Sequence, residues 1–133
     1  MIINLVSLAD VDEVFQTISA RLERGLEKVT ADRSVSDYWM MCRRGDAFLI
    51  TASDGEVKGA IIVQFQAWPH AKVLRILACA GWEMDRWLKD AREYVGMIAR
   101  HGGATSIITE GRAGWERVFP EAKKLRTIYE VNV

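Results

Sequence analysis

The stretch over residues 73–109 constrains the fold more than any other part of this sequence. It opens with VLRILA at 73–78, a nearly continuous apolar run typical of a central strand that is covered on both faces. Apolar residues then recur at helical spacing over 84–98, opposite a charged face, and a short apolar strand follows at 105–109. A strand, a helix and a second strand in this order predict a right-handed parallel crossover.

The segments before this crossover predict two helices and an antiparallel hairpin. Apolar residues at helical spacing over 11–29 indicate a first helix, and a second helix follows the capping pattern Ser34-Val35-Ser36-Asp37. Two β-rich runs, 47–52 and 57–65, flank an Asp54-Gly55 pair that is typical of a tight hairpin turn. This part of the chain therefore places two helices before a mainly antiparallel sheet.

Both ends of the chain predict further strands. A short apolar run at 2–6 indicates a first strand, and Leu125–Val133 is expected to close the sheet as the last one. In that last strand one face would carry Thr127, Tyr129, Val131 and Val133. No linker, repeat or low-complexity stretch interrupts the chain, so residues 1–133 are expected to form a single domain.

Composition excludes several classes of protein. Apolar residues make up 50% of the chain and charged residues 27%, which suits a packed core and is too apolar for a disordered chain. The 18 basic residues balance 18 acidic ones, so the chain has no long-range attraction to a phosphate backbone or an anionic membrane. We therefore expect neither nucleic acid nor membrane among its partners.

Cysteine and histidine usage indicates a reducing compartment and no metal site. The cysteines are Cys42 and Cys79, the histidines are His70 and His101, and none of them has the spacing of a metal-binding cluster. The first residues combine no basic stretch with a long apolar run, so neither a signal peptide nor a transmembrane helix is expected. The expected location is the cytoplasm.

The order of strands and helices, at this length, resembles that of the GNAT acetyltransferase superfamily over essentially the whole chain. From Asp46 onward the hairpin, the central strand, the long helix after Gly81, the strand at Ile107 and the segment 114–131 fall where that family places them. The resemblance implies an α/β (α+β) fold with a mixed, mostly antiparallel central sheet. It also implies a parallel β-α-β crossover, a splayed pair of central strands, and helices on both faces. The chain further looks like the small GNAT-like proteins of tailed phages.

The resemblance implies an acetyl-CoA site where the fourth strand splays from the fifth. In the family, a Q/R-x-x-G-x-G/A loop opens the long helix and offers backbone N–H groups to the CoA diphosphate. Here only Gly81 in the matching stretch 78–83 suits a close approach of the backbone. If acetyl-CoA binds, the candidate cofactor-binding residues are Ala78, Cys79, Ala80, Gly81, Trp82 and Arg86.

Charge at the start of this helix argues against a bound diphosphate. Glu83 and Asp85 would place two carboxylates in its first turn, where they repel an anion and stabilise the helix without a ligand. Arg86 and Lys89 can still reach a phosphate from the side.

Catalytic residues of the family are missing at their usual positions. Acetyl transfer to an amine needs a base for the amine and an acid for the leaving thiolate. Many family members supply the acid as a Tyr in the last helix, but residues 112–119 contain none, and Arg75 is the only ionisable group on the fourth strand. Glu110, at the carboxyl end of a parallel strand, is the candidate acid or base; the alternative is a capping or ion-paired carboxylate.

Several large or reactive side chains allow two interpretations. Trp39, Trp82 and Trp115 are either core residues or, where exposed, anchors of a protein interface. Cys79 is either a packed core thiol or a neighbour of a bound thioester, whereas Trp87 is expected in the core.

Two functions remain open from the sequence. The degraded diphosphate loop and the missing acid and base favour a non-catalytic GNAT-like module that binds a protein partner, for instance a structural protein of a phage particle. The alternative is an active acetyl-CoA-dependent N-acetyltransferase. The expected location is the cytoplasm of a bacterial host, with incorporation into a phage particle under the first interpretation. The position of Trp82 distinguishes the two functions, because its ring would block the acetyl-CoA site if it lay in the gap between the splayed strands.

Overall fold

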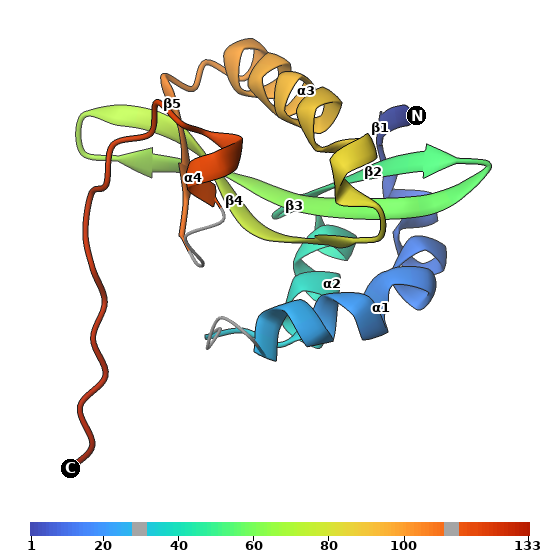
Figure 1. The fold of residues 1–133 in the computed structure, drawn as a ribbon, viewed down its shortest axis with the longest axis horizontal. Helices are drawn as coiled ribbons and strands as arrows, with labels where there is room; N and C mark the ends of the chain where they lie inside the picture. Colours follow the sequence, from blue (N-terminus) through green and yellow to red (C-terminus); the bar gives the residue numbers. More distant parts are fainter. Residues whose placement is uncertain (28–31, 111–114) are drawn as a thin grey trace.

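A computed structural model describes residues 1–27, 32–110 and 115–133, which form a mixed sheet with helices on both faces (Figure 1). The five strands of this sheet lie in the order β1-β2-β3-β4-β5. Their bounds are β1 (Ile2–Leu5), β2 (Phe48–Asp54), β3 (Glu56–Trp68), β4 (Ala71–Gly81) and β5 (Ser106–Thr109). Strands β1 to β4 pair antiparallel, while β4 and β5 pair parallel. The predicted fold class and the predicted parallel crossover are confirmed.

The helices form two layers. Helices α1 (Val11–Glu27) and α2 (Val35–Arg44) cover one face of the sheet, and α3 (Leu88–His101) and α4 (Trp115–Val118) cover the other (Figure 1). Short 3₁₀ turns, η1 (Leu8–Asp10) and η2 (Met84–Arg86), precede α1 and α3. The predicted cap of α2 is present, since the Ser34 side chain accepts from the Asp37 N–H and the Asp37 carboxylate accepts from the Ser34 N–H. In the described part of the chain, no helix has both the length and the apolar character needed to cross a bilayer.

The sheet separates two apolar cores. The core under α1 and α2 includes Phe15, Leu22, Tyr38, Leu49 and Ile62. The core under α3 and α4 includes Ile50, Val63, Leu74, Trp87 and Val95. Strands β2, β3 and β4 contribute buried residues to both cores, so β4 is covered on both faces, as its apolar run predicts.

Trp87 joins the end of β4 to the start of α3. The residue is 1% exposed, as its predicted core position requires. Its indole lies over Gly59 and Gly81, where an added Cβ would overlap the ring. The indole N–H donates to the carbonyl of Trp82 over 2.8 Å. The loop between β4 and α3 is therefore held by one buried side chain.

The long helix begins later than the sequence predicts. Its apolar spacing starts at Met84, but Met84–Arg86 form the 3₁₀ turn η2 and α3 begins at Leu88. The chain reaches η2 through Glu83, which has the left-handed φ of 51°. Placing the Trp87 ring against the two glycines requires a break in the helix at this residue, whose φ is −129°.

The predicted closing strand is wrong. Residues 125–133 have no strand structure and run away from the sheet (Figure 1). Tyr129 is 83% exposed and Val131 is 81% exposed, so the expected face of Thr127, Tyr129, Val131 and Val133 covers no core. The residue types favour a strand, but strand structure needs a neighbouring strand, and within the described residues none lies beside this tail.

Candidate functional site

Strands β4 and β5 separate halfway along β4. Their parallel pairing runs from Val73 with Ser106 to Ile76 with Thr109. Strand β4 then continues to Gly81, paired with β3 alone, while β5 ends. The splayed pair that the resemblance implies is therefore present, and the gap opens at the carboxyl end of β5, where parallel strands place ligands.

A β-bulge lies at the point of separation. Ile62 of β3 faces Ala78 and Val63 faces Ile76, so Leu77 is an extra residue on β4. The extra residue of a bulge is left out of the one-to-one ladder, which makes its backbone groups available to other partners. The hydroxyl of Tyr38 donates to the Leu77 carbonyl over 3.4 Å.

A cavity of about 780 Å³ occupies the gap. Its wall takes residues from α1, β4, α3 and α4, so it reaches both faces of the sheet. Most side chains of the β4 wall are small, and the residues there are Ile76, Leu77, Ala78, Cys79, Ala80 and Gly81. On α1, Gly25 lines the cavity without a side chain. This volume is in the range of small-molecule and cofactor sites.

The ionisable residues of the cavity wall are mainly basic. They are Arg21, Arg24, Lys89, Arg92 and Arg117, against the acidic Asp85 and Glu110. Leu88 and Lys89 also line the cavity. As the first residues of α3, they have backbone N–H groups with no carbonyl acceptor in a preceding turn of that helix. Basic side chains around a helix start suit a phosphorylated ligand.

Trp82 lies outside the cavity wall. Its ring is half-buried on the α1 side, where the Arg21 guanidinium stacks over it at 5.3 Å. Arg21 Nε donates to the Gly81 carbonyl over 3.0 Å, which orients the guanidinium at the end of β4. The indole therefore does not plug the splayed gap.

The carboxylate of Glu83 points to the β2–β3 hairpin. Lys58 Nζ lies 3.2 Å from one of its oxygens, and Arg86 contacts the other at 3.4 Å. The hydrogen bond from Lys58, with the charge of that lysine, lowers the pKa of Glu83. Because α3 starts at Leu88, Glu83 lies outside its first turn, and of the two carboxylates expected to repel a diphosphate only Asp85 lines the cavity.

Only some of the candidate cofactor-binding residues line this cavity. Those that line the cavity are Ala78, Cys79, Ala80 and Gly81. Trp82 and Arg86 do not, because Trp82 contacts Arg21 and Arg86 binds Asp54 of β2 at 2.9 Å. The cavity is lined instead by Lys89, which the sequence already placed near a phosphate, and by Arg21 and Arg24 of α1, which sequence spacing alone does not bring to this loop.

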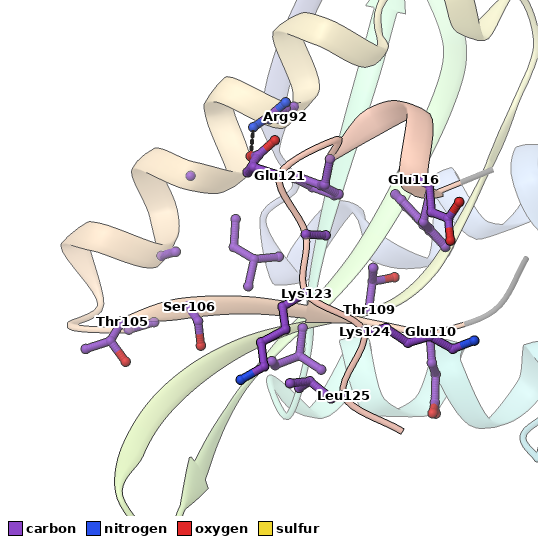
Figure 2. A pocket seen from close by; sticks show the side chains of 18 of the residues that line it. Arg92, Thr105, Ser106, Thr109, Glu110, Glu116, Glu121, Lys123, Lys124 and Leu125 are labelled. Carbon is purple, nitrogen blue, oxygen red and sulfur yellow. Dashed lines mark hydrogen bonds and ion pairs between the residues drawn. The ribbon is translucent and has the colours of Figure 1, made fainter. Parts of the chain in front are cut away.

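Glu110 follows the last residue of β5 and borders two cavities. Its carboxylate pairs with Arg75 of β4 and lies 4.0 Å from Arg126. It lines the cavity in the splayed gap and a second one, of about 1190 Å³, along the outer edge of β5 (Figure 2). Glu110 is thus both a residue of the candidate site and an ion-paired carboxylate.

Tyr38 is a residue that sequence analysis did not single out. Its ring is buried under the sheet, and burial raises the pKa of its phenol, so the hydroxyl stays a donor to the Leu77 carbonyl at neutral pH. The signal was present as an aromatic residue inside α2, but only the fold shows that α2 brings it to the bulge of β4.

Cys79 lines the cavity, and its thiol is neutral. Burial raises its pKa to about 12, and the pKa of Cys42 in the α1–α2 core likewise to about 12. A neutral thiol is a poor nucleophile, so the geometry favours a packed wall residue. Within residues 1–27, 32–110 and 115–133, no group of His, Cys, Asp and Glu side chains gathers as a metal site would require.

The candidate interface tryptophans are half-buried and have partners within the chain. Trp39 stacks on Phe15 at 5.2 Å and donates its indole N–H to Asp12 over 2.7 Å. Trp82 contacts Arg21, and Trp115 stacks on Phe119 at 6.0 Å. Trp39 and Trp115 therefore pack at the edges of the two cores, whereas Trp82 belongs to neither core.

Comparison with known proteins identifies the fold. No protein-family model and no curated sequence matches the chain. Among solved structures, the ribosomal-protein-alanine N-acetyltransferase of Brucella melitensis biovar Abortus 2308 aligns over 100% of both chains, with a TM-score of 0.68 and 14% identity. A probable acetyltransferase aligns over 100% of this chain and 99% of its own, with a TM-score of 0.73 and 12% identity.

An aminoglycoside acetyltransferase from an uncultured soil metagenomic sample, solved in complex with sisomicin, covers 99% of this chain and 95% of its own. Its TM-score is 0.70 at 9% identity. None of these three is described as a phage protein, so the phage likeness stays a prediction. The strand order, the splayed β4–β5 pair and the structural neighbours agree: this chain has the fold of the GNAT acetyltransferases.

Proposed function

We propose that the protein is an acyl-CoA-dependent N-acyltransferase whose donor is acetyl-CoA. The observation that carries this proposal is the cavity of about 780 Å³ that crosses the sheet at the splayed strands and is not closed by Trp82. The sequence alone favoured a non-catalytic module. Trp82 was expected to close the cofactor site, and Glu83 and Asp85 were expected to repel the diphosphate. Trp82 and Glu83 lie outside the cavity wall, and this supports the enzyme over the non-catalytic module.

The cavity wall has the groups that a CoA thioester needs. Lys89, Arg21 and the first backbone N–H groups of α3 would hold the phosphates. The small residues of β4 and Gly25 of α1 leave a narrow apolar passage for the acyl-bearing arm. The loop beside these residues is held by Trp87, whose indole N–H donates to the Trp82 carbonyl.

The donor supplies an activated acyl carbon, and the chain supplies polarisation and proton transfer. We assign to the Leu77 backbone N–H, at the bulge, the polarisation of the acyl carbonyl. Tyr38 holds this bulge from the other side through the Leu77 carbonyl. When bound, the donor would supply a thioester carbonyl for attack by the amine. Glu110, or a water bound there, would accept the amine proton and could return it to the leaving thiolate, which leaves as the free thiol.

Glu110 suits an amine acceptor. Its carboxylate lies at the carboxyl end of β5, beside the gap, and the Arg75 guanidinium orients it. A carboxylate at this place attracts the ammonium form of the acceptor and accepts its proton. Its position in the cavity wall supports both roles.

The test is a calorimetric titration of the full chain with acetyl-CoA. We expect a dissociation constant of roughly tens of micromolar or tighter, about −6 kcal/mol or better. Release of free CoA thiol in the presence of alkylamines and peptides with free N-termini then reports turnover. The two native thiols give little background, because burial raises their pKa to about 12. Absence of binding heat and of thermal stabilisation at millimolar acetyl-CoA would reject the proposal.

Glu110→Gln separates binding from chemistry in the same assay. It should lower turnover by roughly 100-fold or more, as expected for a proton acceptor, and leave the affinity for acetyl-CoA unchanged. Glu116→Gln is the matched control, since Glu116 is an exposed carboxylate of the second cavity and lies outside the first. Equal turnover of the two variants would remove Glu110 from the mechanism.

A protein-binding role is the second proposal. The feature that supports it is the exposed apolar tail after Leu125, and not the tryptophans.

A further inference from the structure

The two oxygens of the Glu110 carboxylate have different surroundings. One oxygen pairs closely with the guanidinium of Arg75 on β4. The other lies 4.0 Å from the guanidinium of Arg126, which is too far for a hydrogen bond. In the described part of the chain, neither that oxygen nor the Arg126 guanidinium has a hydrogen-bond partner. An acceptor and a set of donors, opposite in charge, are therefore available on the two sides of one short gap.

This gap lies where the two cavities meet. Glu110 lines both cavities, and Arg126 lines the one along the outer edge of β5 (Figure 2). A molecule held between these two side chains is thus beside the splayed strands, where we place the acyl group of the donor.

An α-amino acid has two opposite charges at a matching distance. Its ammonium nitrogen and its carboxylate oxygens are roughly 3 Å apart, as the standard bond lengths require. When the molecule lies along the gap, its ammonium donates to the open oxygen of Glu110 and its carboxylate accepts from Arg126. Both contacts are charge-assisted hydrogen bonds, the stronger kind. An amine without a carboxylate makes only the first of them.

The surroundings of Glu110 have an excess of positive charge. Besides Arg75 and Arg126, Arg24 of α1 and Arg117 of α4 line the first cavity together with Glu110. Among the residues that the structure describes, neither Arg24 nor Arg117 pairs with a carboxylate. When an ammonium occupies Glu110, these guanidiniums attract a negative group on the same molecule and repel a second positive one.

Apolar side chains from α1 and α4 line the same cavity. They are Leu26, Trp115 and Val118, and Pro120 follows α4. The volume of about 780 Å³ must also hold the acyl-bearing arm of the donor, so the space for an acceptor is small. A small acceptor with an apolar side chain fits these surroundings.

We propose that the acceptor is a free α-amino acid with an apolar side chain, held between Glu110 and Arg126. This inference rests on the acyltransferase function proposed above and narrows its acceptor from amines in general to zwitterions. The ammonium nitrogen loses two protons as its new bond to the acyl carbon replaces the C–S bond. One proton ends on the released thiol and the other passes through Glu110 to water, so the product is an N-acyl amino acid.

Three matched acceptors test the proposal on the full chain with saturating acetyl-CoA. L-leucine has both charges, L-leucinamide keeps the amine and the side chain without the carboxylate, and 3-methylbutylamine lacks the carboxyl group altogether. We expect kcat/KM for L-leucine to exceed that for each of the others by roughly tenfold or more, mainly through KM. The carboxylate makes the amine of L-leucine more basic than that of the amide, so reactivity alone would favour L-leucinamide.

The outcomes separate this inference from the proposed function. Turnover of L-leucinamide or 3-methylbutylamine equal to that of L-leucine overturns the inference and leaves the acyltransferase in place, and so does turnover of peptides without turnover of L-leucine. Absence of acetyl-CoA binding rejects both.

Arg126→Gln removes the partner that we assign to the carboxylate. It should raise KM for L-leucine by roughly tenfold and change KM for L-leucinamide much less. Because the Arg126 side chain is 63% exposed, the thermal stability should not change. Lys124→Gln is the matched control, since Lys124 is an exposed cation of the same tail that lines only the cavity along β5. An unchanged KM for L-leucine in Arg126→Gln, or an equal rise in Lys124→Gln, would overturn the proposal.

Discussion

Gly25→Trp should abolish the binding of acetyl-CoA, with a loss of roughly 100-fold or more in affinity, about 2.7 kcal/mol. Gly25 faces the cavity of the splayed gap from α1. A Cβ built there meets only the Cys79 carbonyl oxygen, at 3.9 Å, so the helix accepts a side chain at this position without strain. An indole that starts from this point fills the passage between α1 and β4 that we assign to the acyl-bearing arm.

Gly25→Ala is the matched control. It adds one methyl group and leaves the passage open. Glycine is, after proline, the residue least favourable in a helix, so its replacement by alanine should raise the free energy of unfolding by ~0.5–1 kcal/mol. Calorimetry with acetyl-CoA and urea unfolding on both variants give the two readouts. If Gly25→Trp binds acetyl-CoA as tightly as the unaltered chain, the cofactor does not pass between α1 and β4, and our assignment of the cavity is wrong.

The part of the fold that the sequence predicted depends on local periodicity. The apolar run of β4 and the two-faced pattern of α3 are each visible within a few turns of chain, and their order specifies the parallel crossover. The hairpin at Asp54-Gly55 and the cap at Ser34 are equally local, since each depends on residues up to three positions apart.

The candidate site depends on contacts between residues distant in sequence, and there prediction was weaker. Glu83 appeared to belong to a helix start, but Lys58, in the β2–β3 hairpin, draws its carboxylate away. The bulge at Leu77 follows from the register of β4 against β3, and Tyr38 reaches it from α2. No local pattern encodes a register or a contact between a helix and a strand bulge. The position of Glu110 was predictable because strand ends and ligand sites coincide in parallel sheets.

In the tail, residues 125–133, local sequence preference predicted structure that the fold does not contain. Residues 125–133 have strand-forming side chains and alternate correctly, so local preference predicted a closing strand. A strand is completed by backbone partners, and among the residues that the structure describes none pairs with this segment.

Trp87→Ala should destabilise the protein by ~3–5 kcal/mol, as for large aromatic truncations in a core. The ring is 1% exposed, packs on Gly59 and Gly81, and donates to the Trp82 carbonyl. Its removal opens a void that the glycines cannot fill, because their backbones are already held by the β3–β4 ladder. Since a domain is stable by ~5–15 kcal/mol in total, this is a large fraction of its stability.

Two variants separate packing from hydrogen bonding at this position. Trp87→Phe keeps much of the ring but leaves the Trp82 carbonyl without its donor, which should cost ~1–3 kcal/mol. Trp82→Ala removes a half-buried ring and its contact with Arg21, worth ~0.5–1 kcal/mol, and leaves the backbone carbonyl at position 82 bonded to Trp87. Urea unfolding with an unchanged m-value measures all three. If Trp87 holds the β4–α3 loop, the loss of stability is largest for Trp87→Ala, smaller for Trp87→Phe and smallest for Trp82→Ala. Equal losses for Trp87→Ala and Trp82→Ala would show that it does not.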